Sequence, residues 1–212
     1  MIFLKKANIS DAVIRRLPRY YRQLTSLYSQ GVVRISSHSL GQAMNITASQ
    51  IRQDFNCFGE FGQQGYGYNV EELRAAIGHI LGVDLGHHLI MIGVGNLGHA
   101  LLQNFHFTET GFSVDAAFDV SPSVIGQKIH GVPVLPMSEL DSFLQEHHVD
   151  VVVLTIPQSI AQETADHLAE LGVRGFWNFT NMELNFSNSE IHCENIHFAD
   201  SLLTLSYRIA NS

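Results

Sequence analysis

The spacing of apolar residues divides the chain into two parts of different character. Over roughly the first eighty residues, apolar side chains recur at intervals of three and four, which predicts a group of short helices. We expect helices that begin at Ser10-Asp11, at Ser36-Ser37 and at Thr47, and the first of these must kink or restart at Pro18. A short strand over Val32–Ile35 and a last helix from Val70 to about Leu81 complete this part, and Gly82 to Gly86 has the composition of a linker.

The segment from Ser36 to Phe58 has the pattern of a helix-turn-helix. Asn45 can take the left-handed conformation of a tight turn, and Thr47 and Gln50 form a capping box in which each side chain satisfies a free backbone amide of the other. The next helix is expected to turn inward Ile51, Phe55 and Phe58, and to turn outward Ser49, Arg52, Gln53 and Asn56. A short helix, a tight turn and a second helix with a polar face are typical of proteins that read the major groove of DNA.

Two further features belong to this pattern. The segment from Gly59 to Tyr68 is rich in glycine and aromatic residues, which predicts a tight β-hairpin, the wing of a winged helix. Three arginines, Arg16, Arg19 and Arg22, lie along the early helix and are candidates to hold DNA phosphates, although solvated helix arginines are equally common.

After the linker the pattern changes to alternating strands and helices. Strands are expected at Leu89–Ile92, Ser113–Phe118, Val151–Ile156 and Gly175–Asn178, and helices at Leu97–Phe105, Met137–Glu146 and Ser159–Leu171. Short, β-branched strands that alternate with helices predict an α/β fold with a parallel sheet covered on both faces. The last segment, Ala199 to Ile209, is an apolar helix that is expected to pack on another domain or another subunit.

A dinucleotide-binding motif lies between the first two of these strands. It reads Gly93-Val94-Gly95-Asn96-Leu97-Gly98, with a strand before it and a helix after it. Gly93 suits the tight turn, Gly95 allows the backbone to approach a pyrophosphate, and Gly98 permits close packing of helix on strand.

The acid that completes such a motif is also in place. Asp119 ends the second strand, where a carboxylate binds the adenosine ribose and repels a 2′-phosphate, so NAD is favoured over NADP. Thr155 and Pro157 follow a later strand and are expected to line the same crevice. The alternative is a glycine-rich turn with no ligand, as in related CoA-binding or degenerate Rossmann domains.

Charge and composition add to this picture. The net charge is −8, but the first 82 residues hold nine of the twelve Lys and Arg against five acids, a balance of +4, which leaves −12 for the rest. Such a split indicates two domains with different partners, the basic one a candidate for nucleic acid. The two cysteines and twelve histidines show no metal-type spacing, and neither a membrane span nor a secretory signal is evident, so we expect a cytoplasmic protein with reduced thiols and no metal.

The sequence resembles the Rex-type redox-sensing transcriptional repressors over nearly its whole length. The shared segments are residues 16–22 (RLPRYYR), 51–55 (IRQDF), 58–62 (FGEFG), 65–70 (GYGYNV), 93–102 (GVGNLGHALL), 117–120 (AFDV) and 131–134 (GVPV). The resemblance implies a homodimer in which an N-terminal winged-helix DNA-binding domain (1–82) precedes a Rossmann-type doubly wound parallel sheet that binds NAD or NADH (86–190), with a C-terminal domain-swapped helix (191–212). It also implies that NADH releases the repressor from operator DNA.

The resemblance carries site residues with it. It implies DNA contacts by Arg16, Ser49, Gln50, Arg52, Gln53, Asn56, Gln63, Gln64 and Tyr66, and nucleotide contacts by the motif residues, Asp119, Val120, Thr155, Pro157 and Phe198. Phe198 is expected near the nicotinamide of the other subunit. No catalytic residue is expected.

Several positions depart from the family pattern. Gln53, Gln63 and Gln64 stand where members usually carry basic residues, and each missing cation removes an interaction with DNA. Asn104, or Phe105 with a shifted gap, replaces a tyrosine, and His197 replaces an aspartate that pairs with the arginine matched by Arg16. We therefore expect Arg16 to lack its anionic partner, and Arg16, Asn104 and His197 to form an altered switch.

Two alternatives to an NADH-responsive repressor follow from the sequence. One is a Rex-like paralogue whose NADH response is weakened or altered. The other is an NAD-dependent oxidoreductase, which is disfavoured because the chain has no Tyr-x-x-x-Lys pair, too few residues for a separate substrate domain, and no obvious acid or base beside the nicotinamide position.

Overall fold

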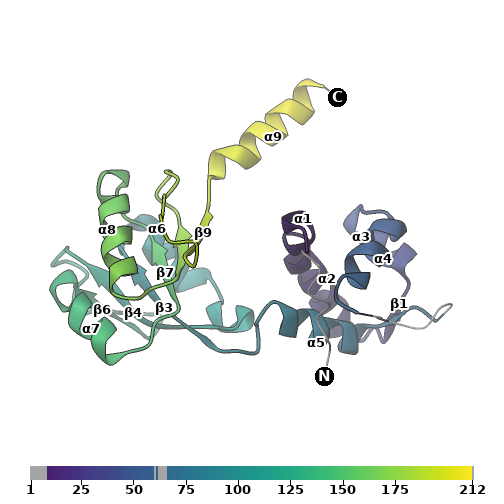
Figure 1. Ribbon diagram of the computed structural model, residues 1–212, viewed down its shortest axis with the longest axis horizontal. Helices are drawn as coiled ribbons and strands as arrows, with labels where there is room; N and C mark the ends of the chain where they lie inside the picture. The colour runs from purple at the N-terminus through teal and green to yellow at the C-terminus, as the bar shows by residue number, and fades with distance from the viewer. Residues whose placement is uncertain (1–8, 60, 62–65, 212) are drawn as a thin grey trace. The chain divides into compact units, whose positions relative to one another are not determined.

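The computed structural model describes residues 9–59, 61 and 66–211. The chain forms two compact units, Met1–Leu85 and Gly86–Ser212 (Figure 1). Among the described residues no helix is both long and apolar enough to cross a bilayer.

The first unit is a small helical domain with one two-stranded sheet. Its elements are α1 (Asp11–Ile14), α2 (Leu17–Ser29), β1 (Arg34–Ile35), α3 (Ser37–Met44), α4 (Ala48–Asn56), β2 (Tyr68–Asn69) and α5 (Val70–Ile80). The first predicted helix restarts with Pro18 in the opening turn of α2, where its missing N–H costs nothing. Every helix contributes to one core, which includes Leu24, Leu40, Ile51 and Ile77, each nearly or fully buried.

The turn between α3 and α4 shows why the sequence folds there as predicted. Asn45 has a left-handed backbone (φ 56°), and a Cβ on Gly41 would overlap the carbonyl oxygen of Ile46, so the two helices meet too closely for a side chain at that point. Thr47 Oγ1 accepts a hydrogen bond from the backbone N–H of Gln50, as expected for the cap. The reciprocal half of the predicted capping box is wrong, because the Gln50 side chain donates to the carboxylate of Asp54 instead.

The predicted wing falls largely outside the described residues. Gln63 and Gln64 lie there, as do Glu60, Gly62 and Gly65. At the base of this segment β2 pairs antiparallel with β1, in the register Arg34 with Asn69. Tyr66 is 71% exposed, and the guanidinium of Arg34 lies 6.0 Å from its ring centroid.

The second unit is built on a seven-stranded sheet. Its strands are β3 (His87–Ile92), β4 (Phe112–Asp119), β5 (Lys128–Ile129), β6 (Val132–Pro136), β7 (Val151–Leu154), β8 (Gly175–Asn178) and β9 (His192–Asn195), in the spatial order β5-β6-β4-β3-β7-β8-β9. All neighbours are parallel except the β5–β6 pair at one edge. From β6 to β9 the six parallel strands follow the doubly wound order 3-2-1-4-5-6, which confirms the predicted fold class.

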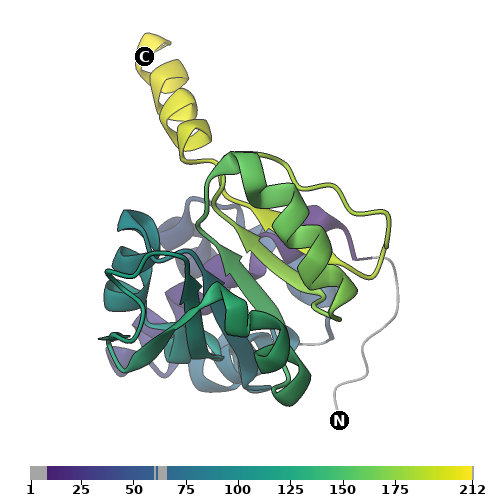
Figure 2. The same cartoon turned by 90° about the vertical axis from the view of Figure 1, so that its left-hand side faces the viewer.

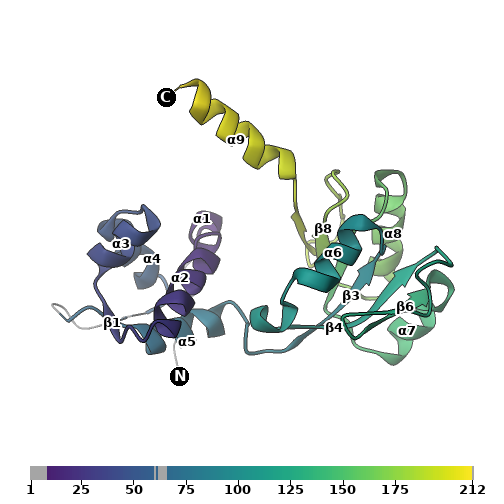
Figure 3. The same ribbon diagram turned by 180° about the vertical axis from the view of Figure 1, so that it is seen from behind.

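Helices cover both faces of this sheet, as the apolar strands predict (Figures 2 and 3). Along β3, Ile90 and Ile92 join the core beneath α7 (Leu140–Glu146) and α8 (Gln158–Glu170). The alternate residues Leu89 and Met91 join the core beneath α6 (Asn96–Asn104) and the 3₁₀ turn Phe107–Thr110. The unbroken apolar run Leu89–Ile92 is therefore explained by burial on both sides of the sheet.

Several elements differ from the sequence expectation, among them β5 and the 3₁₀ turn Phe107–Thr110, which no pattern predicted. The strand β6 was not predicted because it carries Pro133 and Pro136, which disfavour a central strand. β9 was not predicted because its residues are polar and half exposed. The predicted helix Met137–Glu146 is a 3₁₀ turn, Met137–Glu139, followed by α7. The final helix, α9 (Phe198–Ala210), forms as predicted.

Candidate functional site

A cavity lies where the direction of the sheet's winding reverses. β3 and β7 are parallel neighbours, and the chain leaves them toward opposite ends of the sheet, so their carboxyl ends form a topological switch point. A cavity of about 510 Å³ opens there. It is lined by six of the predicted nucleotide residues, Gly93, Gly95, Asp119, Val120, Thr155 and Pro157.

The three motif glycines are required for different reasons. Gly93 has a φ of +92°, and a Cβ there would lie 2.8 Å from the carbonyl oxygen of Thr155. A Cβ on Gly98 would overlap the carbonyl oxygen of Gly93, so this residue sets the approach of α6 to the turn. Gly95 differs from both, because a Cβ there would meet no atom of the protein within 4 Å, and its φ of −70° suits any residue. Nothing in the fold requires glycine at this position, which points to an approaching ligand.

Asp119 holds the glycine-rich turn as well as facing the cavity. One carboxylate oxygen accepts the backbone N–H of Val94 at 2.5 Å, and the other accepts that of Ser121 at 2.7 Å. Since a carboxylate oxygen can accept more than one hydrogen bond, both retain capacity for ribose hydroxyls. The sequence indicated the ligand role of Asp119 but not this second one.

Thr155 ties the turn to the neighbouring strand. Its hydroxyl donates to the carbonyl of Gly93 at 2.6 Å, which fixes β7 against the end of β3. Pro157 then begins α8 as its N-cap residue. Both residues therefore shape the cavity wall.

Part of the lining was not predicted. The unpredicted residues are Ile92 and Phe118 at the ends of β3 and β4, Met137 in the 3₁₀ turn after β6, and Ile160 and Thr164 in α8. Apart from Thr164, they could have been found from the sequence because each lies close to the carboxyl end of a strand, the edge of the sheet where a ligand is expected. Ile156 lies in the wall between Thr155 and Pro157, as expected for the end of that strand. Of the predicted residues, Val94, Asn96, Leu97 and Gly98 are in the turn and the first turn of α6 but do not line the cavity.

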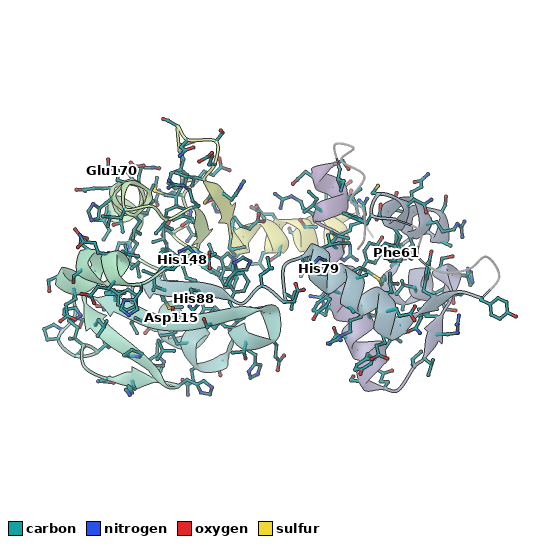
Figure 4. The ribbon with its side chains drawn as sticks, turned by 60° about the horizontal axis from the view of Figure 1, so that its bottom comes forward. Phe61, His79, His88, Asp115, His148 and Glu170 are labelled. Atoms are coloured by element: carbon teal, nitrogen blue, oxygen red, sulfur yellow. The ribbon has the colours of Figure 1, made fainter. Side chains whose placement is uncertain are left out.

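Side chains at the opposite, amino-terminal edge of the sheet form histidine–carboxylate pairs. His88 Nδ1 lies 2.7 Å from Asp115 Oδ2, and His148 Nε2 lies 2.9 Å from Asp150 Oδ1 (Figure 4). Within the described part of the chain, no group of three or more His, Cys, Asp or Glu residues is arranged to hold a metal ion.

The helix α4 presents the polar face predicted for it. Ser49, Arg52, Gln53 and Asn56 are exposed, and Arg52 donates from Nη1 to Ser37 Oγ at 3.0 Å. The opposite face is buried with Ile51 and Phe55. Gln50 is different, because its carboxamide donates to Asp54 Oδ1 at 2.8 Å and is directed away from the outward face.

The expectation that Arg16 lacks an anionic partner is wrong. Its guanidinium donates from Nε and Nη2 to the two carboxylate oxygens of Asp54, at 2.6 and 2.7 Å. Asp54 is only 1% exposed, and its hydrogen bond raises the pKa of Arg16 above its usual value. The sequence did not reveal this pair, because the residues are 38 positions apart and Asp54 lies within an apolar pattern.

The other two predicted switch residues belong to the second unit. Asn104 ends α6 and its side chain donates to the carbonyl of Ala100 at 2.9 Å, and His197 is the N-cap residue of α9. Between these two ends runs a chain of aromatic rings. Phe105 lies 5.4 Å from Trp177, Trp177 lies 4.7 Å from Phe179, and Phe179 lies 6.0 Å from Phe198. Phe198 is 54% exposed and is not part of the cavity wall.

Both halves of the chain match families of known proteins. Residues 8–56 match the family model described as "Putative DNA-binding protein N-terminus", and residues 86–182 match "CoA binding domain". A redox-sensing transcriptional repressor Rex from Clostridium beijerinckii is 47% identical over 208 residues, which cover 98% of this chain and 98% of that protein. A Rex repressor from Caldanaerobacter subterraneus is 47% identical over 97% of this chain and 91% of its own length.

Solved structures agree with these relatives. The crystal structure of RSP in complex with beta-NAD+ and operator DNA has a TM-score of 0.89 and 46% identity, and the alignment covers 97% of this chain and 94% of that one. The complex of RSP with beta-NADH has a TM-score of 0.88 and 43% identity over 97% of this chain and 96% of that one. With sequence identity and fold in agreement from end to end, the chain belongs to the Rex family of redox-sensing transcriptional repressors.

Proposed function

We propose that this chain is a DNA-binding transcriptional repressor that senses the balance of NADH and NAD, and that NADH binding releases it from operator DNA. The observation that carries the proposal is the cavity at the β3–β7 switch point, where Gly95 is glycine for no reason internal to the fold. The same chain carries a helix-turn-helix with an exposed polar face. The relatives are redox-sensing repressors, and RSP has been crystallised with NADH and with NAD+ and operator DNA.

NAD or NADH fits the residues around the cavity. The free backbone amides at the start of α6 suit a pyrophosphate, because a helix N-terminus attracts negative charge. Asp119 would bind the ribose hydroxyls and repel the 2′-phosphate of NADP. The apolar side chains of Phe118, Met137 and Ile160 would pack against the base.

Operator DNA is the proposed partner of the first unit. Arg52, Gln53 and Asn56 would reach base edges from α4, with Ser49 at the start of the helix. Gln63, Gln64 and Tyr66 would contact DNA from the wing. Because glutamine carries no charge, the wing would add fewer phosphate contacts, and affinity would depend less on salt than with a basic wing.

The proposed assembly is a homodimer. α9 is exposed over its whole length, with Leu202, Leu203 and Leu205 each more than half exposed, and an apolar helix in that state suits a second copy of the chain. We assign residues 1–82 to the winged-helix domain, 86–190 to the nucleotide domain and 191–212 to the exchanged helix. Phe198 would then lie near the nicotinamide of the partner.

A regulator is preferred to an oxidoreductase. Among the described residues that line the cavity, the single carboxylate is Asp119, and the hydroxyls of Thr155 and Thr164 already donate to backbone carbonyls. None of these groups is placed as a general acid or base. Location with the bacterial chromosome in the cytoplasm follows from the proposed role.

The second candidate function is that of a Rex-family repressor whose response to NADH is weaker than in other members. It is favoured by Asn104 and His197, whose side chains differ from the family pattern. A ligand shifts an equilibrium only through its different affinities for two states, so changed switch residues can reduce the response without affecting either binding site.

The test is a titration of the full-length protein on a palindromic operator duplex. Fluorescence anisotropy would follow operator binding while NADH, NAD or coenzyme A is added, and a shuffled duplex serves as the control. We expect tight binding that NADH reverses and that NAD and coenzyme A leave largely intact. Binding that ignores NADH would favour the second candidate, and no operator binding at low salt would refute the DNA assignment.

A further inference from the structure

A buried carboxylate on the recognition helix receives four hydrogen bonds. One oxygen of Asp54 accepts Arg16 Nε at 2.6 Å and the hydroxyl of Tyr20 at 2.7 Å. The other accepts Arg16 Nη2 at 2.7 Å and Gln50 Nε2 at 2.8 Å. An ionised carboxylate has about four acceptor sites, so Asp54 is fully satisfied without any ligand.

Three of the four donated hydrogen bonds come from α2 and its N-cap residue, and the fourth comes from Gln50 of α4 itself. Arg16 is the N-cap residue of α2, and Tyr20 lies one turn further along that helix. The ring of Tyr20 is fully buried and packs edge-on against Phe55 with centroids 5.0 Å apart. Asp54 thus joins α4 to α2 through two side chains, beside a packed aromatic pair.

We propose that Arg16 and Tyr20 are positioning residues for the recognition helix, acting through Asp54, and that Arg16 is not a phosphate contact. This inference rests on the proposed DNA-binding function. The side-on fork of a guanidinium on a carboxylate fixes both distance and orientation. It therefore sets the rotation of α4 about its axis, and with it the direction in which Arg52 and Asn56 leave the opposite face.

A second arginine of α2, Arg19, holds α3, the helix that precedes the recognition helix. Arg19 donates from Nη2 to the carbonyl of Met44, the last residue of α3, at 3.3 Å. A cation at a helix C-terminus is stabilising because the last carbonyls carry partial negative charge. Arg16 and Arg19, which the sequence analysis made candidates for phosphate contacts, thus hold the two helices of the helix-turn-helix.

The ion pair is present at neutral pH. Burial alone would raise the pKa of Asp54, but the hydrogen bonds from Arg16, Tyr20 and Gln50 outweigh this effect and hold the pKa below its usual value. The positive charge of Arg16 is consequently compensated within the protein. A DNA phosphate would therefore gain little from Arg16, because the guanidinium is already ion-paired with a carboxylate.

The decisive experiment compares Asp54→Asn and Arg16→Gln in the full-length protein, with Arg22→Gln as the matched exposed arginine of α2. Binding to operator and to shuffled duplex would be measured over a series of salt concentrations. For the first two variants we expect operator affinity to fall about tenfold or more, with little change on shuffled duplex and in the slope of log K against log salt. Arg22→Gln, at a candidate phosphate contact, should lower that slope by about 0.9 for each phosphate that the side chain no longer neutralises.

The opposite hypothesis makes a prediction of opposite sign. If Arg16 contacts phosphate, Asp54→Asn would free it and operator affinity would stay or rise, and Arg16→Gln would reduce the salt slope. Either result would overturn the proposal. Failure of the unmodified chain to bind any operator would instead overturn the proposed function.

Milder variants guard against loss of folding. Arg16→Lys keeps the charge but not the fork, and Tyr20→Phe keeps the buried ring but removes one donor. Circular dichroism and NADH binding would establish that each is folded. We expect both to lower the ratio of operator to shuffled-duplex affinity, and an unchanged ratio in both folded variants would refute a positioning role.

Discussion

Gly95→Ala is expected to separate nucleotide binding from folding and DNA binding. The backbone at Gly95 (φ −70°, ψ −165°) is open to alanine, and the added Cβ would meet no protein atom within 4 Å. Alanine reduces the freedom of the unfolded chain, worth about 0.4–1 kcal/mol, but Gly95 is the N-cap residue of α6 and alanine is a poorer N-cap than glycine, so the free energy of unfolding should change little. The methyl group would occupy the space through which the backbone approaches a pyrophosphate.

The size of the binding loss follows from the hydrogen bond that is blocked. A hydrogen bond to a charged group contributes about 1.5–3 kcal/mol, so loss of one amide–phosphate bond should weaken NADH binding by roughly tenfold to a hundredfold. Isothermal titration would give that affinity, and thermal unfolding would give the stability. Operator binding without nucleotide should remain at the level of the unmodified chain.

Gly98→Ala is the matched control, since it is the same change in the same motif. Its Cβ would overlap the carbonyl oxygen of Gly93 and would lie 2.8 Å from the hydroxyl of Thr155, so the turn or α6 must move. We expect a loss of about 2 kcal/mol or more in stability, in contrast to Gly95→Ala. If Gly95→Ala binds NADH as tightly as the unmodified chain, the pyrophosphate does not pass over Gly95 and the assignment of the cavity is refuted.

Three further outcomes are expected. Asp119→Asn should weaken NADH binding in titrations, because it sets an amide against the N–H of Val94. It should also reduce the ratio of NADH affinity to NADPH affinity, because it removes the charge that repels a 2′-phosphate. An unchanged affinity ratio would contradict the assignment of Asp119. The pKa of Asp54 is lowered in the folded state, so its stabilisation is present above the unfolded pKa of about 3.9 and is lost as pH falls through the folded value. Urea unfolding between pH 7 and 3 should therefore show a steeper loss for the unmodified chain than for Asp54→Asn, and equal losses would argue against this carboxylate. Leu202→Lys with Leu205→Lys should shift the protein to monomer in sedimentation without unfolding it, since both side chains are exposed within one chain; a persistent dimer would place the interface elsewhere.

The parts of the molecule that could be predicted are those whose cause is local. The turn from Gly93 to Gly98 and the caps at Thr47 and Asn45 are fixed by residues within a few positions of one another, and each forms as its pattern indicates. The doubly wound sheet also followed, because strands buried on both faces leave an unmistakable run of apolar residues such as that of β3.

The parts that escaped prediction depend on distant contacts. β6 pairs with β4 despite two prolines, since its register is supplied by the neighbouring strand rather than by its own propensity. Three of the four hydrogen bonds onto Asp54 come from Arg16 and Tyr20, which are more than thirty positions away. A lone acid at a buried helical position signals an unseen partner, because an unpaired buried charge is too costly to retain. That rule would have indicated an ion pair at Asp54, though not which cation forms it.

The Asp54 pair also changes how the family departures are interpreted. The replacement of an aspartate by His197 raised the expectation that Arg16 would be left without an anion, and hence that the switch would be broken at its DNA-binding end. Arg16 instead has a complete partner within its own unit, so the DNA-binding face does not need the missing aspartate in order to be ordered. In the second unit, the rings of Phe105, Trp177, Phe179 and Phe198 join the end of α6 to the start of α9, and these contacts are the ones we expect to carry the response to NADH. We therefore expect variants around Asp54 to change operator affinity without NADH, and variants of these aromatic residues to change release by NADH, so that the two properties can be separated by mutation.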